Sequence, residues 1–179
     1  MKSKVKLAFL AAALSFSVAG CGSERGYEVP NSLCEVPVPA EYLEPLLTSG
    51  EELEQQESGF GANRGLEGCE VLVDEKVAIS TRGEWHRAGE TAADAAGNPA
   101  PKPFGDGQYT VWDRGASAAI PCRATGEEVV ASDGGGQGAE VFTLEVHVPT
   151  PDEHTEAAMK KLIVPYAKAY REKLTCEGR

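Results

Sequence analysis

The stretch EVFTLEVHVPTPDEHTEAAMKKLIVPYAKAYREKL, residues 140–174, predicts the outline of the fold. Its first nine residues alternate in polarity, which is the period of a strand with one buried face. The remainder carries apolar side chains every three or four residues, as an amphipathic helix does. We therefore expect a strand over 140–148 and then a helix that ends near Leu174. The buried stripe of this helix is expected to contain Met159, Leu162, Ile163, Tyr166, Tyr170 and Leu174.

A helix-start signature lies between the two elements. Thr150 is in the position of a capping residue, Pro151 is in the first turn and Glu153 follows three residues after the cap. The helix is therefore expected to begin after Thr150 and to bend at Pro165, since proline removes a backbone donor from the helix interior.

The region before this stretch is expected to supply the rest of the sheet. Alternation between Cys69 and Thr81 predicts a hairpin that turns at 74–76, and Trp85 either continues its second strand or folds back on it. Further strands are expected over 109–112, 118–122 and 127–131, with a hairpin loop over 132–138. Residues 90–106 combine alanine, proline and glycine without apolar periodicity, so we interpret them as a long loop between two halves. An internal duplication of these halves stays open.

The N-terminal half contains one expected helix and one acidic segment. The helix starts after Pro39, ends near Gly50 and directs an apolar face inward, formed by Tyr42, Leu43, Leu46 and Leu47. Residues 51–57, EELEQQE, are interpreted as a solvated face, with a docking site for a basic partner as the alternative. Residues 59–68 are glycine-rich and expected to form a loop. Together, the expected strands and helices predict a single α+β domain over 29–177. It consists of an antiparallel sheet with a short N-terminal helix and a long C-terminal helix packed on one face.

The first 20 residues have the outline of a signal peptide. Three lysines precede an uncharged apolar run of 13 residues, which is shorter than the roughly 20 residues that a transmembrane helix needs. Val18-Ala19-Gly20-Cys21 resembles the lipobox of bacterial lipoproteins, in which the cysteine thiol receives a diacylglycerol group and the cysteine becomes the new N-terminus. The alternative is ordinary cleavage near Ala19 that leaves an incidental cysteine. We expect lipidation of Cys21, a tether over 21–28, and a location on the outer face of the bacterial cytoplasmic membrane.

The cysteine count agrees with export. Five cysteines leave an even set once Cys21 is assigned to the lipid, namely Cys34, Cys69, Cys122 and Cys176. Four cysteines allow three pairings. We expect Cys34 with Cys69 and Cys122 with Cys176, because each bond would then close one half of the chain. The set contains no C-x-x-C, and with three scattered histidines a zinc site is not expected.

The charge balance restricts the partners. Acidic residues number 28 and basic residues 17, a net charge of −11, and loss of the three leader lysines leaves 14 basic residues and a net charge of −14. Such a chain is repelled by phosphate backbones and by anionic headgroups, so neither nucleic-acid binding nor membrane association through a basic patch is expected.

Several of these features together resemble a group of small, uncharacterised secreted lipoproteins of actinobacteria. They are the lipobox, Leu33-Cys34 before a short leucine-rich helix, Gly68-Cys69 at the start of a hairpin, the strand Ile120-Pro121-Cys122 and a helix that ends at Cys176. The resemblance spans most of residues 27–177. It implies an extracytoplasmic location and a fold type without a function.

No catalytic signature stands out in the chain. Glu145 and His147 are expected on the polar face of one strand, where they either support acid–base chemistry or form a solvated surface. His86 has no identifiable partner and His154 is expected to be exposed. The glycines at 134–138 do not open a helix and lack a following Lys-Ser/Thr, which argues against a phosphate loop. Carboxylate pairs such as Glu51-Glu52 lack calcium-loop spacing, and no metal or cofactor is assigned.

The leading functional hypothesis is a tethered, non-catalytic binding or interaction module that recognises an envelope protein or a small ligand. The alternative is a carrier of a small apolar molecule held near Trp85, Trp112 and Tyr166. A hydrolase that uses His147 and Glu145 is the third. Trp85, Trp112, Phe104 and Tyr109 flank the central loop and serve either as core or as the lining of a pocket.

Overall fold

The computed structural model describes residues 25–61, 66–97, 100–125, 131 and 138–177. The expected signal peptide 1–20, the lipobox cysteine Cys21, most of the expected strand 127–131 and nearly all of the loop 132–138 lie outside the described residues.

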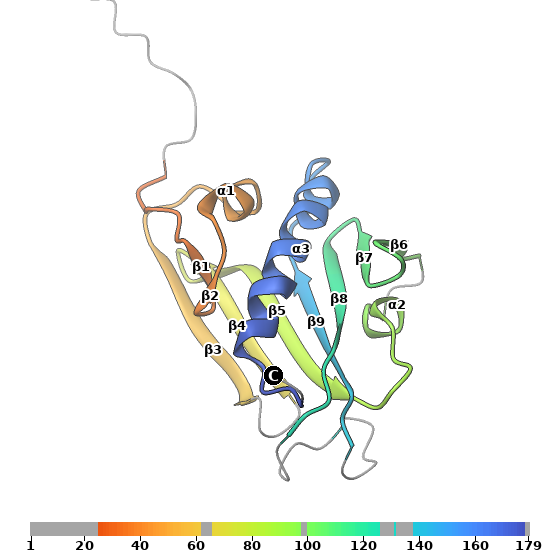
Figure 1. Cartoon of the computed structure of the whole chain (residues 1–179). Coiled ribbons are helices and arrows are strands. Elements are labelled where there is room, and N and C mark those ends of the chain that lie inside the picture. The colour runs from red at the N-terminus through yellow and green to blue at the C-terminus, as the bar shows by residue number, and fades with distance from the viewer. Residues whose placement is uncertain (1–24, 62–65, 98–99, 126–130, 132–137, 178–179) are drawn as a thin grey trace, which may run out of the picture.

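The centre of the fold is a seven-stranded antiparallel sheet with the order β3-β4-β5-β9-β8-β7-β6 (Figure 1). The strands of the two halves of the chain meet at the pair β5–β9, and β9 pairs with β8 on its other side. The strands are β3 (Leu53–Gly61), β4 (Leu66–Val73), β5 (Lys76–His86), β6 (Lys102–Phe104), β7 (Tyr109–Trp112), β8 (Gly115–Pro121) and β9 (Val141–His147).

Helix α3 (Thr155–Lys173) and an N-terminal layer cover one face of this sheet (Figure 1). The layer consists of the hairpin β1 (Ser32–Leu33) and β2 (Val36–Pro37), helix α1 (Ala40–Leu43) and the 3-10 helix η1 (Glu44–Leu46). All six predicted members of the helix stripe are buried, and they share one core with Leu43, Phe142 and Leu144. The α+β architecture predicted from the sequence is confirmed.

The start of α3 differs from the prediction. The helix begins at Thr155 rather than just after Thr150, and Asp152 organises its first turn. The Asp152 carboxylate accepts hydrogen bonds from the His154 N–H and the Thr155 hydroxyl, each at 2.9 Å, while the Asp152 N–H donates to the Thr155 Oγ1 at 2.8 Å. These bonds form a turn just before the helix, whose N-cap residue is His154 rather than the predicted Thr150. The helix continues through Pro165.

The prediction of a loop over 59–68 was wrong in part, and the acidic run 51–57 lies largely in a strand. Most of the acidic run and residues 59–61 form the edge strand β3, and β4 begins already at Leu66. Gln55 points toward the hairpin β1–β2, where its side chain accepts a hydrogen bond from the Cys34 N–H at 2.6 Å and donates to the Ser32 carbonyl at 3.1 Å. The acidic side chains of the run are exposed, as expected for an edge strand.

The expected loop 90–106 also contains regular structure, namely helix α2 (Ala92–Ala95) and the edge strand β6. Thr91 and Asp94 form a capping box at α2, which local spacing alone could have revealed. The Ser117 hydroxyl donates to the Ala92 carbonyl. Because Ser117 alternates with the core residues Ala116 and Ala118, this contact places α2 on the face opposite α3.

Both predicted disulfides are present. Cys34–Cys69 joins the hairpin β1–β2 to β4, and Cys122–Cys176 joins the end of β8 to the segment after α3. Cys34 and Glu35 both have positive φ angles, 54° and 63°, which is the conformation of a two-residue hairpin turn. Two disulfides indicate an oxidising compartment outside the cytoplasm. Among the helices of the described residues, none is both long and apolar enough to cross a bilayer.

Candidate functional site

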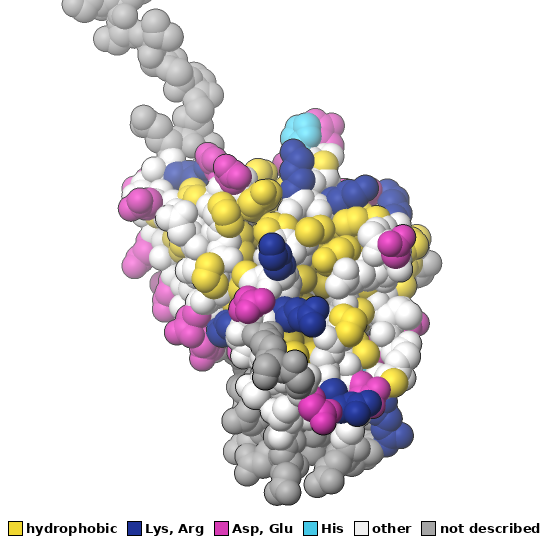
Figure 2. All heavy atoms as spheres, viewed as in Figure 1, with side chains coloured by type: hydrophobic (Ala, Val, Ile, Leu, Met, Phe, Trp, Pro, Cys, Tyr) yellow, Lys and Arg dark blue, Asp and Glu magenta, His cyan; other side chains and the backbone are white. Residues whose placement is uncertain are grey.

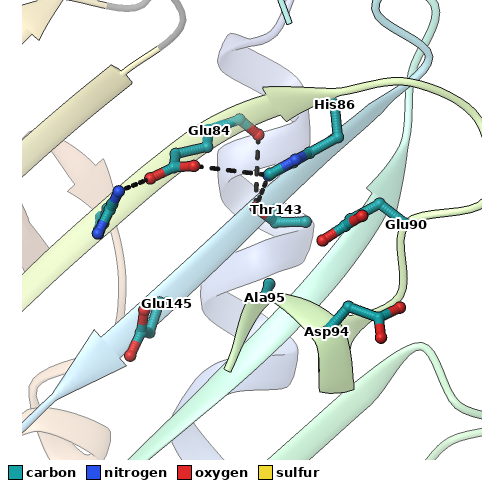
Figure 3. Close-up of a pocket in the computed structure, with 8 residues that line it drawn as sticks. Glu84, His86, Glu90, Asp94, Ala95, Thr143 and Glu145 are labelled. Carbon is teal, nitrogen blue, oxygen red and sulfur yellow. Dashed lines mark hydrogen bonds and ion pairs between the residues drawn. The ribbon is translucent and has the colours of Figure 1, made fainter. Parts of the chain in front are cut away.

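A polar hollow lies on the face of the sheet that α3 leaves open (Figure 3). Its volume is about 180 Å³, and the side chains that line it come from β5, from β9 and from the segment around α2. They are Arg82, Glu84, His86, Glu90, Asp94, Ala95, Thr143 and Glu145.

The floor of the hollow follows from strand alternation. Arg82, Glu84 and His86 occupy every second position of β5, so they share one face of the sheet. The register pairs Arg82 with Glu145 and Glu84 with Thr143 on the neighbouring strand β9. Two short runs of polar side chains, in which Glu84 and Thr143 are 59 residues apart in the chain, therefore become one surface.

Helix α2 and the residue Glu90 form the wall. The Asp94 carboxylate accepts hydrogen bonds from the Thr91 N–H at 3.1 Å and the Thr91 hydroxyl at 2.6 Å, and these bonds lower the Asp94 pKa. Asp94 therefore stays ionised at neutral pH. The capping box that starts α2 thus also fixes a negative charge at the rim of the hollow.

His86, Thr143 and Glu84 form a hydrogen-bonded group on the floor (Figure 3). The Thr143 Oγ1 is hydrogen-bonded to the His86 Nε2 at 2.8 Å and lies 3.5 Å from the Glu84 carbonyl, to which it donates. The Glu84 carboxylate is 3.8 Å from the same Nε2 atom and also pairs with the Arg82 guanidinium. The imidazole is thereby held between a hydroxyl and a carboxylate.

The electrostatic character of the hollow is negative. Four carboxylates, those of Glu84, Glu90, Asp94 and Glu145, are opposed by the single guanidinium of Arg82. Burial raises the pKa of the Glu145 carboxyl, the positive charge of Arg82 opposes this effect, and the negative charge of Glu84 adds to it. A positively charged group that entered the hollow would relieve the repulsion among the carboxylates.

The predicted pair Glu145 and His147 is brought to one face of β9, as alternation required. Glu145 lines the hollow, whereas His147 lies beyond it, opposite Ser80 and Gly115. The pKa of His147 is lowered, first by burial and then by the positive charge of Arg114. The two side chains therefore face the same side of the sheet without lining the same pocket.

The aromatic side chains considered for an apolar ligand lie in different places. Trp85 and Tyr166 are buried in the core between the sheet and α3. Phe104 and Tyr109 stack on each other at the edge of the sheet, with ring centroids 5.4 Å apart. Trp112 alternates with the core residue Val111, so its indole is buried on the other face.

Sequence reasoning found Glu145 but missed most of the hollow. Arg82, Glu84 and His86 form an R-x-E-x-H pattern with the period of a strand, which would have signalled a shared polar face had the strand been extended beyond Thr81. His86, for which no partner was identified, bonds to Thr143. His154 is exposed, as expected. The glycine-rich segment 134–138 lies almost wholly outside the described residues.

The described part of the chain contains no group of three or more His, Cys, Asp or Glu side chains arranged to hold a metal ion. Comparisons with known proteins give no further assignment, because no family model, no curated protein and no solved structure matches the chain.

Proposed function

We propose that the protein is a lipid-anchored, extracytoplasmic binding module that recognises a positively charged group through the hollow on the open face of its sheet. The observation that carries this proposal is the set of four carboxylates around one guanidinium in a concave, partly buried site. The coarse location rests on the two disulfides.

The size of the hollow supports a small charged moiety as the bound group. Pockets for drug-sized ligands usually measure about 300–1,000 Å³, whereas this one measures about 180 Å³. An ammonium or guanidinium group fits such a volume, either in a small amine or at the end of a side chain of a partner protein. Its charge would be met by Glu84 and Glu145 on the floor and by Glu90 and Asp94 on the wall.

The geometry around His86 supports a non-catalytic role. In a hydrolytic triad the carboxylate and the nucleophile approach opposite nitrogens of the imidazole, so that one orients the ring while the other loses a proton. Here the Glu84 carboxylate and the Thr143 hydroxyl both approach Nε2. Thr143 is only 4% exposed, and its hydroxyl donates to a backbone carbonyl, which leaves it badly placed to attack a substrate.

The membrane anchor in this proposal is a lipid on Cys21, because Val18-Ala19-Gly20-Cys21 resembles a lipobox. The anchored protein would sit on the outer face of the bacterial cytoplasmic membrane. Intact mass spectrometry of the protein from its native type of host tests this part directly. We expect the mass of residues 21–179 plus a diacylglyceryl group, with four cysteine hydrogens missing, and loss of the lipid in the Cys21→Ser variant.

Calorimetric titration of the mature protein with choline, putrescine and arginine amide tests the binding site. We expect at least one of these cations to bind, and Glu84→Gln and Glu145→Gln each to weaken its binding about tenfold. Glu54→Gln, the same change on the exposed edge strand β3, is the matched control and should leave binding unaltered. Absence of binding by all three cations, or equal loss in the control, would refute the proposed ligand class.

A further inference from the structure

The outer face of α3 carries a stripe of positive charge on an acidic protein. Ala157, Lys161, Val164, Lys168 and Arg171 are three or four residues apart and all exposed, so they form one continuous line along the helix. We refer to these five residues as the α3 stripe. Figure 2 shows dark blue side chains along the course of α3 with hydrophobic side chains on both sides. Val164 is the exposed large hydrophobic side chain among the described residues.

Three acidic side chains near the stripe form ion pairs. Glu44 pairs with Arg25 at 3.2 Å, and Glu156 pairs with Lys102 at 2.6 Å. Glu35 lies 3.9 Å from Lys173 at the other end of the helix. Within the described ranges, Lys161 and Lys168 have no carboxylate at ion-pair distance.

A groove of about 250 Å³ separates α1 from the first turns of α3 and adjoins the stripe. Tyr42 and Pro45 supply apolar surface on one side, and Lys161 supplies a cation beside the ring of His154 on the other. Glu41 is its acidic member. Aromatic rings beside lysines are typical of surfaces that meet a bilayer at headgroup level.

The length of the tether places this side of the domain close to the anchor. Four residue steps separate Cys21 from Arg25, which is at most about 14 Å of extended chain. The Arg25 side chain is fixed to η1 through hydrogen bonds to the carbonyls of Glu44 and Leu47, at 2.8 and 3.1 Å. Since α1 and η1 pack against α3, a lipid on Cys21 would bring the groove and the stripe within reach of the headgroups.

We propose that the α3 stripe and the adjoining groove dock on the anionic phospholipid headgroups of the membrane that holds the anchor. The inference rests on the proposed lipidation of Cys21. From the net charge of −14 we expected no membrane association through a basic patch. The net charge is a sum over the whole surface, however, and here the positive and negative side chains are concentrated in different regions. Docking through α3 leaves the hollow on the opposite face of the sheet directed away from the membrane and open to ligand.

Lysine acetylation of the mature protein in vesicles tests this docking. The protein is inserted through its own lipid into vesicles of phosphatidylcholine alone or of phosphatidylcholine with phosphatidylglycerol, and acetylation rates are read by peptide mass spectrometry. We expect Lys161 and Lys168 to react about threefold or more slowly in the anionic vesicles. The difference should disappear at 1 M salt, where charges are screened within about 3 Å.

Charge-reversal variants provide the control. Lys160 is next to the stripe, so we expect it too to react more slowly in anionic vesicles in the wild type and to lose this protection in Lys161→Glu/Lys168→Glu. Arg87→Glu/Arg114→Glu changes the net charge by the same amount at sites outside α3 and should keep Lys160 protected. Loss of protection in both variants would show that the protection depends on the net charge of the protein rather than on α3. This result would overturn the proposed surface.

Three other outcomes would also overturn the proposal. Equal rates in both vesicle types would refute lipid docking, and protection confined to native membranes would assign the surface to an acidic protein. A mature mass without diacylglycerol would remove the anchor on which the geometry depends. Cation titration of the hollow is independent of all three, so the binding proposal stands or falls separately.

Discussion

Gly83 on β5 lies directly against the ring of Phe142 on β9, with no room for a side chain between them. A Cβ atom at position 83 would come within 2.9 Å of the Phe142 Cε1 and still closer to Cζ. The same ring packs edge-on against Trp85, with centroids 5.0 Å apart, and stacks on Tyr170 at 5.2 Å. The space between the central strands and α3 is therefore filled by aromatic side chains around one glycine.

Gly83→Ala is expected to destabilise the domain by about 1–3 kcal/mol, because the added methyl group forces Phe142 out of its position. Urea unfolding followed by tryptophan fluorescence measures the change, since Trp85 contacts the displaced ring. A midpoint equal to that of the wild type would show that the core can absorb the methyl group.

Removing either disulfide is expected to cost about 3–4 kcal/mol, because the unfolded chain regains the freedom of a long closed loop. The Cys122–Cys176 bond spans 54 residues and the Cys34–Cys69 bond 35, so the first should cost slightly more. Thermal unfolding of the paired Cys→Ser variants compares them. A larger loss for Cys34→Ser/Cys69→Ser would mean that native contacts around the hairpin β1–β2, rather than loop length, set the order.

Tyr170→Phe is expected to lower stability by about 1 kcal/mol. The Tyr170 hydroxyl donates to the Glu67 carboxylate and so joins α3 to β4. Burial and the nearby Glu67 raise the Tyr170 pKa, so the phenol remains a donor over the whole neutral range. Unfolding of Tyr170→Phe, Glu67→Gln and the double variant measures the coupling, and additive losses would argue against a direct bond.

Acid should weaken the start of α3. Hydrogen bonds from Thr155 and His154 lower the Asp152 pKa below its ordinary value of 3.8. A carboxyl whose pKa is lower in the folded state stabilises fully above its unfolded pKa and loses that contribution as the pH falls through the folded value. The free energy of unfolding, measured between pH 2 and 6, should therefore fall less steeply with acid in Asp152→Asn than in the wild type. Glu153→Gln is the neighbouring control.

Glu145 should have the opposite pH dependence. Burial raises its pKa above the ordinary value of 4.5, so its contribution to stability is greatest below that pH and is lost as the pH rises through the folded value. Glu145→Gln should gain stability relative to the wild type between pH 4 and 7. If the two proteins differed in free energy of unfolding by the same amount at every pH in this range, the Glu145 carboxylate would be solvated in the folded state.

Periodic elements with a buried face were predictable from the sequence. The buried face of the C-terminal helix, from Met159 to Leu174, and the strand β9 were predicted from the spacing of their apolar residues. Both contribute to the core as expected. The edge strand β3 was missed because only alternate side chains, such as Leu53 and Gln55, turn away from solvent, so acidic composition dominates the segment.

The hollow was less predictable for a different reason. Glu84 and Thr143 meet only because β9 inserts between β5 and β8, and no local pattern encodes that order. Its wall depends on α2, a helix of four residues that is too short to show helical periodicity. The capping pair Thr91 and Asp94 was the available signal for that helix.

The bond between Cys34 and Cys69 also determines how the domain responds to mechanical tension. A pull on the N-terminal end can peel away the chain only from Arg25 to Cys34, nine residue steps or roughly 30 Å when extended. Beyond that point the load passes through the two sulfur atoms into β4, which is hydrogen-bonded to β3 on one side and to β5 on the other. Further extension requires both ladders of β4 to break, so the disulfide makes the interior of the sheet, rather than its edge, resist force applied at the tether.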